Sequence, residues 1–358
     1  MKTVNHHKLL YKNENDLGVK LPKVVRYKHR NPRDGSDSYG ALDIAAKYCG
    51  IYKPLTEFKS LWQHGCQPPW WHVPEIHVYH RKPLDCDRFF VARDDEKELL
   101  HKAGYSNVYS IGLPYVYLPE IKQKKKRKNS LLVMPIHTIG SVPFNSEQQI
   151  NNYVDFIVRQ SKDFKDVVVC LHRGCIEHGY WIEEFNDKNI KCILGADPND
   201  KNALMRIKSL VSTFEYMTTN DWGSHVAYAL SDGSKVSVCG PCPERDMKTL
   251  LQNKGWQNNT RGYKEIYSES ADNEMSNILN KIYCNPIDGV ADIELGRYLI
   301  GKSNKKLKHE LKKIFNWDSV WLDCLYKLDV TYGFVLNGIE MYIKGLIPNS
   351  IRYAIYRK

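Results

Sequence analysis

The sequence predicts an α/β protein with two domains, each built on a parallel β-sheet that helices cover. Short apolar segments alternate with amphipathic segments along most of the chain, and the alternation restarts after a run of basic residues. Strands that alternate with helices favour parallel sheets. The 358 residues suffice for two domains, and the 42% of hydrophobic and 11% of aromatic residues suffice for a packed core, which excludes global disorder.

The first α/β unit is expected over residues 1–121. Its predicted strands are 24–27, 58–62, 88–92 and 108–111. Its predicted helices are 39–48 and 94–103. Gly50 and Gly104 follow these two helices, and the second helix has acidic residues in its first turn, which is the pattern that helix ends favour.

Residues 122–129 are interpreted as a linker between the two units. They contain the densest charged run of the chain, KQKKKRK. A block of like charges is typically solvated and unstructured. Nuclear-localisation and RNA-binding segments have the same composition, and this alternative stays open.

The second α/β unit is expected over residues 130–273. Its predicted strands are 130–135, 167–171, 190–194, 216–219 and 235–239, and its predicted helices are 146–161, 179–185, 202–214 and 224–230. Ser146 is a candidate N-cap, and the apolar VVVCL segment is typical of a buried parallel strand. Residues 274–358 are expected to form a helical, basic segment. The whole pattern predicts two Rossmann-like domains facing a cleft, with ligands at the carboxyl ends of the strands.

The composition favours a cytoplasmic protein with an anionic partner. The chain has 52 Lys+Arg and 41 Asp+Glu, a formal net charge of +11, which favours phosphate groups, nucleic acid or an acidic membrane face. Ten scattered cysteines and a polar start predict reduced thiols and no signal peptide. No apolar run approaches the about 20 residues that cross a bilayer.

Three motifs match known sites but lack the surroundings that those sites need. GRYLIGKS at 296–303 matches a phosphate-binding P-loop, but no apolar strand precedes it. CGPC at 239–242 has the spacing of a redox pair but closes a strand late in an α/β unit, which favours a Gly-Pro turn. CLHRGCIEH at 170–178 has zinc-ligand residue types crowded at one strand end. We therefore predict no metal and no cofactor, and we place His172 and Arg173 at a strand end that faces the cleft.

Three segments place polar residues at predicted carboxyl strand ends. SLWQHG at 60–65 contains His64, whose imidazole can take a proton near neutral pH. MPIHTIG at 134–140 follows a strand, and TTNDWGSHVAY at 218–228 joins a strand to a helix start, where backbone N–H groups and the helix dipole attract anions. The candidates for holding a phosphate are His137, Thr138, Gly140, Arg173, Thr219, Asn220, Gly223, Ser224 and His225. The simpler alternatives are a turn histidine at position 64 and an ordinary N-cap at 218–225.

These segments resemble those of GT-B glycosyltransferases, in particular bacterial enzymes of capsule and lipopolysaccharide biosynthesis. The similarity covers about residues 20–245 and includes WQHG, IGLPYVYLPE, LLVMPIHTIG and EYMTTNDWGSHVAYALSDGSKVSVCGP. The late turn is placed like the serine/threonine motif with which this fold holds the donor phosphate. WQHG is similar to the WHG loop of the teichoic-acid polymerases, whose histidine is the base. Here Gln63 separates Trp62 from His64, and TTNDWGSH replaces a TDYSS-like turn.

The resemblance implies a metal-independent glycosyltransferase whose partners are a nucleotide-sugar donor and a glycan or lipid-linked acceptor, with no nucleic acid. His64, or a carboxylate such as Asp37 or Asp43, would deprotonate the acceptor hydroxyl, and the helix start at 223–225 would hold the donor phosphate. The basic amphipathic stretch 340–358 suits peripheral contact with the inner face of an anionic membrane, or a helix that packs back across the domains. The alternatives are a sugar-nucleotide epimerase or phosphotransferase on the same scaffold, and a basic nucleic-acid-binding protein.

Overall fold

The structure is a computed structural model that describes most of the chain. The described residues are 10, 17, 19–26, 35–51, 58–79, 81–121, 125–137, 144, 146–244, 273, 277 and 279–318. Two predicted site residues, Thr138 and Gly140, lie outside the described residues, as do the side chain of Asp37 and the amphipathic stretch 340–358.

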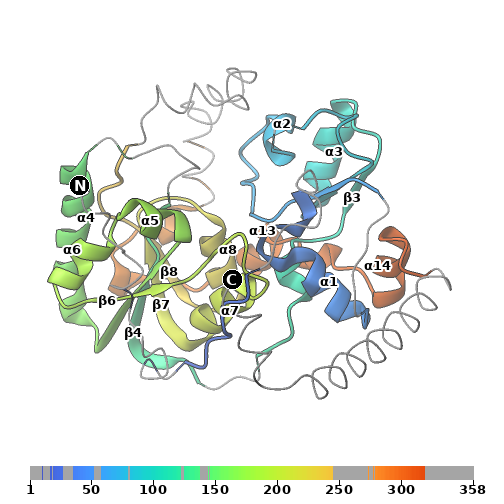
Figure 1. Ribbon diagram of the computed structural model, residues 1–358. Coiled ribbons are helices and arrows are strands. Elements are labelled where there is room, and N and C mark those ends of the chain that lie inside the picture. Colours follow the sequence, from blue (N-terminus) through green and yellow to red (C-terminus); the bar gives the residue numbers. More distant parts are fainter. Residues whose placement is uncertain are drawn as a thin grey trace, which may run out of the picture.

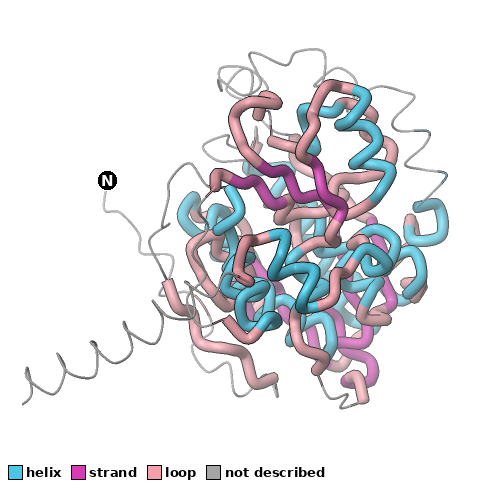
Figure 2. The backbone as a smooth tube through the Cα atoms, turned by 90° about the vertical axis from the view of Figure 1, so that its right-hand side faces the viewer, coloured by secondary structure: helices cyan, strands magenta, loops and turns pink. Residues whose placement is uncertain are grey.

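Two parallel β-sheets form the centres of the two halves of the molecule (Figures 1 and 2). The first sheet has the order β1-β2-β3, and the second has the order β6-β5-β4-β7-β8. The strands are β1 (Ser60–Trp62), β2 (Arg88–Val91), β3 (Val108–Ser110), β4 (Arg127–Val133), β5 (Asp166–Leu171), β6 (Lys191–Leu194), β7 (Phe214–Thr219) and β8 (Lys235–Val238). The predicted α/β class with two parallel-sheet units is confirmed.

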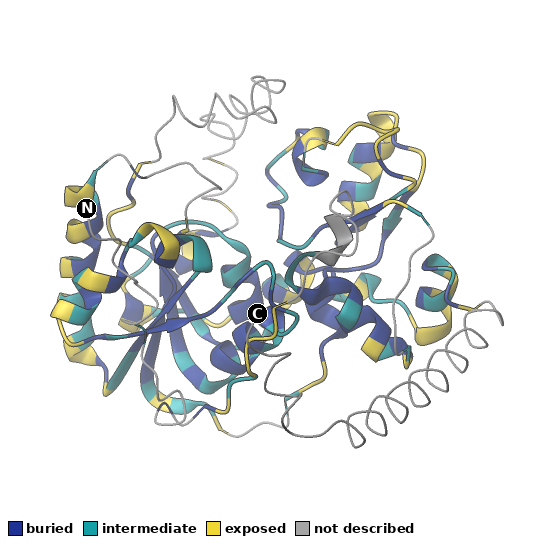
Figure 3. Ribbon diagram, in the orientation of Figure 1, coloured by how far each residue is buried: buried dark blue, intermediate teal, exposed yellow. Residues whose placement is uncertain are grey.

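Helices cover the strands of both sheets, and their outer faces are exposed (Figure 3). The first half contains η3 (Gly35–Gly40), α1 (Ala41–Cys49), α2 (Pro74–His77), α3 (Asp94–Lys102) and η4 (Pro114–Tyr117). The second half contains α4 (Glu147–Gln160), η5 (Ser161–Asp163), α5 (Arg173–His178), α6 (Ile182–Asp187), α7 (Ala203–Thr213) and α8 (Ser224–Ser231). Among the described helices, none has the length and apolar character that a membrane span requires.

Two helix predictions differ from the structure. The helix expected over 179–185 is replaced by α5 and α6, because the chain turns at Gly179 and Trp181, whose φ angles are 77° and 73°. Ser146 precedes α4 as expected, but its side chain makes no capping hydrogen bond.

The strand order of the second sheet contains a topological switch point between β4 and β7. The chain runs outward from β4 through β5 to β6 on one side, and then returns to place β7 and β8 on the other side of β4. In open parallel sheets, ligands bind at the carboxyl ends of the strands beside this point. The segments that follow β4 and β7 contain His137 and the turn into α8.

The segment 19–26 lies along the second half, and the strand predicted over 24–27 does not form in its described part. The Val25 N–H donates to the Asp200 carboxylate at 2.7 Å, and the Lys201 N–H donates to the Val25 carbonyl at 3.0 Å. Arg26 forms only an isolated bridge with Asp200. The backbone of this segment is thus satisfied by residues 200 and 201 in place of a sheet neighbour, which corrects its expected place in the first unit.

The predicted linker at 122–129 is only partly a linker. Residues 122–124 lie outside the described residues, and strand β4 already begins at Arg127. The ammonium group of Lys126 is largely buried and donates to the carbonyls of Val211 and Phe214, at 2.6 and 3.3 Å, and to the Ser234 hydroxyl at 3.0 Å. Carbonyls at the end of α7 attract a cation because they have no helical N–H partner.

The described part of the C-terminal segment crosses from the second half to the first. It contains η6 (Asn280–Ile282), η7 (Pro286–Asp288), α13 (Ile293–Leu299), η8 (Lys302–Asn304) and α14 (Lys308–Ile314). Helix α13 packs so closely on α8 that a Cβ atom at Gly296 would lie 2.2 Å from the Ser231 nitrogen. Helix α14 lies beside α1 (Figure 1), and the Phe315 ring contacts Trp62 in β1. The segment therefore fastens the two halves together.

Candidate functional site

A cavity of about 570 Å³ lies between the two halves. His64 follows β1 in the first sheet, while His137, His172 and His225 follow β4, β5 and β7 in the second sheet, and all four side chains line the cavity. Gly223 and Ser224 line it as well. The cavity therefore lies at the carboxyl ends of both sheets, where the topology predicts a ligand.

The backbone around His64 is held by two tyrosines. The N–H groups of His64 and Gly65 both donate to the Tyr79 hydroxyl at 3.3 Å, and the Tyr228 hydroxyl donates to the His64 carbonyl at 3.1 Å. The imidazole stacks on the Tyr79 ring with 4.6 Å between ring centroids. Its Nδ1 atom is buried and has no hydrogen-bond partner among the described residues. Burial lowers the pKa of His64 to about 4, with a smaller contribution from the charge of His137.

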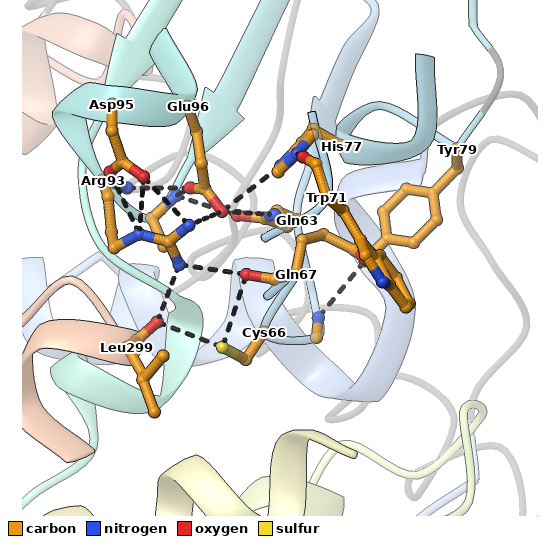
Figure 4. A network of polar contacts seen from close by, with 12 residues as sticks. Gln63, Cys66, Gln67, Trp71, His77, Tyr79, Arg93, Asp95, Glu96 and Leu299 are labelled. Atoms are coloured by element: carbon orange, nitrogen blue, oxygen red, sulfur yellow. Dashed lines mark hydrogen bonds and ion pairs between the residues drawn. The ribbon is translucent and has the colours of Figure 1, made fainter. Parts of the chain in front are cut away.

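Behind His64, a buried polar network fixes the start of its loop (Figure 4). The Gln63 amide donates to Glu96 at 3.1 Å and accepts from the Ala92 N–H at 2.9 Å. Glu96 also forms an ion pair with Arg93 at 3.1 Å and lies 3.4 Å from the Nδ1 atom of His77. Gln63 is therefore an anchor that fixes the chain immediately before the histidine.

The network extends to two other parts of the cavity wall. The Nε2 atom of His77 lies 2.7 Å from the carbonyl oxygen of Trp71, which lines the cavity. Arg93 donates to the Gln67 carbonyl at 3.0 Å, and the Cys66 thiol donates to the Leu299 carbonyl at 3.2 Å. Burial raises the pKa of Cys66 to about 12, so this thiol is not a nucleophile at neutral pH.

The start of α8 also lines the cavity, through Gly223, Ser224 and His225. The first N–H groups of a helix have no carbonyl partner within that helix, and here they belong to Ser224 and His225. The Ser224 hydroxyl accepts a hydrogen bond from the Cys66 N–H at 2.8 Å. The Nε2 atom of His225 is buried without a hydrogen-bond partner in the described part of the chain. Burial, and secondly the charge of His137, lowers the pKa of His225 to about 3.

His172, which the sequence placed at a strand end facing the cleft, pairs with Tyr39, a residue that the sequence did not identify as part of the site. The Nδ1 atom of His172 accepts from the Gly174 N–H at 3.0 Å, so a neutral ring carries its proton on Nε2. That Nε2 atom lies 3.1 Å from the Tyr39 hydroxyl, which leaves the phenol proton available to another acceptor. Tyr39 has a φ of 57°, a backbone conformation that is unfavourable for a side chain of this size and is often found at functional sites.

Aromatic rings complete the wall. Trp70 of the first half meets Trp222 of the second edge to face, with 4.9 Å between ring centroids. The indole N–H of Trp222 is buried and lacks an acceptor among the described residues. The aromatic residues of PWWHVPEIHVY at 69–79, shortly after the HG pair, are the sequence signal that would have identified this part of the site.

Among the described residues that line the cavity there is no lysine or arginine, and Asp221 is the one carboxylate. Its Oδ1 atom accepts from the Trp222 N–H at 2.7 Å. The polar side chains that line the cavity are therefore mainly imidazoles, phenols and indoles, joined by Gln67, Asp221 and Ser224.

Three predicted site residues do not line the cavity. The Asn220 side chain accepts from the Ile136 N–H at 3.0 Å and donates to the Pro241 carbonyl at 3.1 Å. The Thr219 hydroxyl donates to the Asp221 carbonyl at 3.1 Å, and Arg173 pairs with Asp197 at 3.0 Å. Thr219 and Asn220 thus fix the loop between β7 and α8, and at the end of β5 it is His172, not Arg173, that reaches the cavity.

The three motifs that match other sites have separate places in the structure. Gly296 lies inside α13, and Gly301 follows its end with a φ of 66°, so GRYLIGKS is not a loop between a strand and a helix. Cys239 and Cys242 follow β8 and are not joined in a disulfide. Among the described residues, no group of three histidine, cysteine or acidic side chains could hold a metal ion.

No protein-family model matches the chain, and no curated protein matches it. Among solved structures, S. aureus MnaA with UDP is similar at 15% identity, with 70% of this chain and 67% of that chain covered and a TM-score of 0.33. UDP-GlcNAc 2-epimerase from Neisseria meningitidis bound to UDP-GlcNAc is similar at 15% identity, with 71% and 69% covered and a TM-score of 0.36. A mutant of the S. aureus protein TarM in complex with fondaparinux, alpha-GlcNAc-glycerol and UDP is similar at 11% identity, with 68% and 46% covered and a TM-score of 0.26.

Proposed function

We propose that this protein is a glycosyltransferase that moves a sugar from a nucleotide-activated donor to a hydroxyl group of a glycan or lipid-linked acceptor in surface-polysaccharide biosynthesis. The observation that carries the proposal is the meeting of His64 and the start of α8 at one cavity between two parallel sheets. The resemblance of both segments to those of GT-B transferases supports the same assignment.

The start of α8 is the proposed site for the donor phosphate. The N–H groups of Ser224 and His225 and the positive end of the helix dipole favour an anion there. When the bond between sugar and phosphate breaks, negative charge grows on the leaving phosphate. Donors already fixed at that position bind the transition state more tightly than the ground state, and this lowers the barrier.

His64 is the proposed base for the acceptor hydroxyl. Its Nδ1 atom is buried at the cavity and has no hydrogen-bond partner among the described residues, so it can accept a proton from a bound alcohol. The alternative carboxylate Asp43 pairs with Lys201, at 3.6 Å, and does not line the cavity.

Incubation with UDP-, GDP-, CMP- and CDP-linked sugars, with and without glycan acceptors, tests the proposal. Release of nucleotide together with a larger glycan, both detected by mass spectrometry, would support a transferase. Conversion of a donor sugar without any acceptor would support the epimerase alternative. Failure to act on any donor, together with salt-dependent binding of nucleic acid, would overturn the proposal in favour of a nucleic-acid-binding protein.

Three substitutions separate the proposed roles. We expect His64→Ala to lower turnover by about 10²- to 10⁴-fold while donor affinity is largely kept, because a general base acts on the acceptor. We expect Ser224→Ala and His225→Ala to weaken donor binding. His101→Ala, at an exposed position on α3, is the matched control and should change neither quantity.

A further inference from the structure

A chain of hydrogen bonds runs from the backbone of the second half to a phenol at the cavity. The Gly174 N–H, in the first turn of α5, donates to the Nδ1 atom of His172 at 3.0 Å. The Nε2 atom of His172 lies 3.1 Å from the Tyr39 hydroxyl. Tyr39 and His172 both line the cavity. The chain therefore ends at a hydroxyl group in a side chain of the cavity wall.

The direction of the hydrogen bonds along this chain is fixed. An imidazole nitrogen that accepts an N–H has no proton of its own, so the proton of a neutral ring is on the other nitrogen. Burial, and then the charges of His137 and Arg173, lowers the pKa of His172 well below 6.5, and the ring is neutral at neutral pH. The Nε2 atom of His172 therefore donates to the Tyr39 oxygen. The phenol keeps its own proton for another hydrogen-bond acceptor.

The described residues supply no acceptor for the phenol proton. Among them, the hydrogen bond with His172 is the only one that the Tyr39 hydroxyl makes. The Nδ1 atom of His64 is not the acceptor either, since it has no hydrogen-bond partner in the same part of the chain. Burial raises the pKa of Tyr39, so the phenol stays protonated at neutral pH. A molecule bound in the cavity can supply the missing acceptor.

The second half of the molecule also holds the backbone of Tyr39. Its N–H donates to the Pro198 carbonyl at 2.9 Å, and its φ is 57°, an unfavourable value that persists only where the surroundings fix the residue. The next residue, Gly40, packs so closely that a Cβ atom there would lie 2.3 Å from the Lys201 carbonyl oxygen. The phenol is therefore held at both its backbone and its hydroxyl.

The Tyr39 ring lies beside His64, with 5.3 Å between ring centroids. Because His64 is the proposed base, the part of a ligand next to Tyr39 is the part next to the reacting hydroxyl. A neighbouring hydroxyl of the same sugar can accept the phenol hydrogen bond and leave the reacting oxygen free. This position favours the acceptor sugar over the nucleotide as the partner of Tyr39.

We infer that Tyr39 binds the acceptor sugar by donating a hydrogen bond to a hydroxyl oxygen next to the one that reacts, and that His172 orients the phenol for this contact. The inference rests on the proposed function, because it assumes that His64 deprotonates an acceptor sugar. Tyr39 then determines specificity, and His172 is a positioning residue. A sugar without that hydroxyl would leave the phenol proton unpaired, so the site selects sugars that have it.

Steady-state kinetics of the full chain test this inference, with the donor and the glycan acceptor that react in the incubations above. Tyr39→Phe removes the hydroxyl and keeps the ring. We expect kcat/KM for the acceptor sugar to fall about 5- to 100-fold while the donor KM is largely unchanged, because one contact with the acceptor sugar is lost. With one monodeoxy analogue of that sugar, the wild type and Tyr39→Phe should react equally, since the partner oxygen is already missing. Tyr109→Phe, on β3 and outside the cavity wall, is the matched control and should behave as the wild type.

His172→Asn tests the orienting role, and it keeps the inference testable if Tyr39→Phe does not fold. Asparagine is a favoured N-cap whose oxygen can accept from the Gly174 N–H, but its side chain is too short to reach Tyr39. We expect a smaller loss of kcat/KM for the acceptor sugar, and a double variant that matches Tyr39→Phe alone, because without the phenol oxygen His172 has no group to orient.

Three results would overturn this inference alone. They are unchanged acceptor kinetics in Tyr39→Phe, additive effects of the two substitutions, and a change confined to the donor KM. Absence of transfer by the wild type with every donor and acceptor would overturn the proposed function and this inference with it.

Discussion

The Ser224 hydroxyl accepts a hydrogen bond from the backbone N–H of Cys66, with 2.8 Å between nitrogen and oxygen. Cys66 follows the HG pair of the first half, and Ser224 begins α8 of the second half. Gly65 lies so close to this bond that a Cβ atom there would be 2.8 Å from the Ser224 oxygen. The two halves thus meet at a point where position 65 has no room for a side chain.

This contact predicts that Gly65→Ala and Ser224→Ala are coupled. Each single substitution should lower the free energy of unfolding by about 1–3 kcal/mol, the first by overpacking and the second by leaving a buried N–H group without an acceptor. The double variant should lose less than the sum, because Ser224→Ala removes the oxygen atom that the new methyl group meets. Urea denaturation of the four proteins measures the coupling free energy.

A matched control uses Ser231 at the other end of the same helix. Its hydroxyl donates to the Tyr228 carbonyl within α8 and is remote from Gly65. The pair Gly65→Ala and Ser231→Ala should be additive. Additivity in the Ser224 pair as well would contradict the close approach of the two halves at this point.

The fold was predictable where local pattern decides it. The apolar run VVVCL was expected to form a strand over 167–171, and β5 spans Asp166–Leu171. The helix expected over 224–230 is α8, Ser224–Ser231. In both cases the pattern of apolar residues within the segment itself decides the element, and packing against the rest of the sheet agrees with it.

The sequence was less informative where distant residues decide the outcome. Lys126 belongs to a run that resembles a solvated linker, yet carbonyls about 85 residues later in the chain hold its ammonium group. The site pair Tyr39 and His172 lies 133 residues apart in the sequence. No short-range pattern encodes such contacts, because they depend on how the two halves pack.

The buried imidazoles predict how stability depends on pH. Burial lowers the pKa of His64 to about 4 and of His225 to about 3, from 6.5. At pH values between 6.5 and these lowered pKa values, the unfolded chain binds protons on the two histidines that the folded chain does not bind. The free energy of unfolding should therefore be retained above pH 6.5 and fall as the pH decreases through this window.

Urea denaturation between about pH 4.5 and 7.5 measures this dependence. His225→Gln should show a shallower loss of stability toward low pH, because the variant has one fewer buried group to protonate. His101→Gln, at an exposed site, should follow the wild-type profile. If His225→Gln also follows the wild-type profile, the ring does not titrate in a buried environment.

The three hydrogen bonds of Lys126 predict a structural role for one lysine of the basic run. Lys126→Met should lower the free energy of unfolding by about 1–3 kcal/mol, because the carbonyls of Val211 and Phe214 lose a donor inside the protein. Lys125→Met, at the exposed neighbouring position, is the control and should change stability by less than about 0.5 kcal/mol. Equal effects of the two substitutions in urea denaturation would show that the run acts only through its total charge.

The network behind His64 predicts that substitutions of two adjacent carboxylates, Glu96 and Asp95, have very different effects on the free energy of unfolding. Glu96 is buried, pairs with the buried guanidinium of Arg93, and accepts from Gln63. Glu96→Gln should lower the free energy of unfolding by about 3–5 kcal/mol, because it leaves the Arg93 charge buried without its main counter-ion. Asp95 pairs with the same guanidinium, but its side chain is 47% exposed, so Asp95→Asn should cost about 1 kcal/mol or less.

Gln63 belongs to this network and directly precedes His64, so a substitution of Gln63 should also affect the cavity. A Gln63→Leu variant keeps the Arg93–Glu96 ion pair but removes the bonds to Glu96 and to the Ala92 N–H. We expect its urea midpoint to lie closer to that of the wild type than the midpoint of Glu96→Gln does. Its turnover of a nucleotide-sugar donor should fall, because the position of His64 is no longer fixed. Wild-type turnover in Gln63→Leu would show that the position of His64 does not depend on the network.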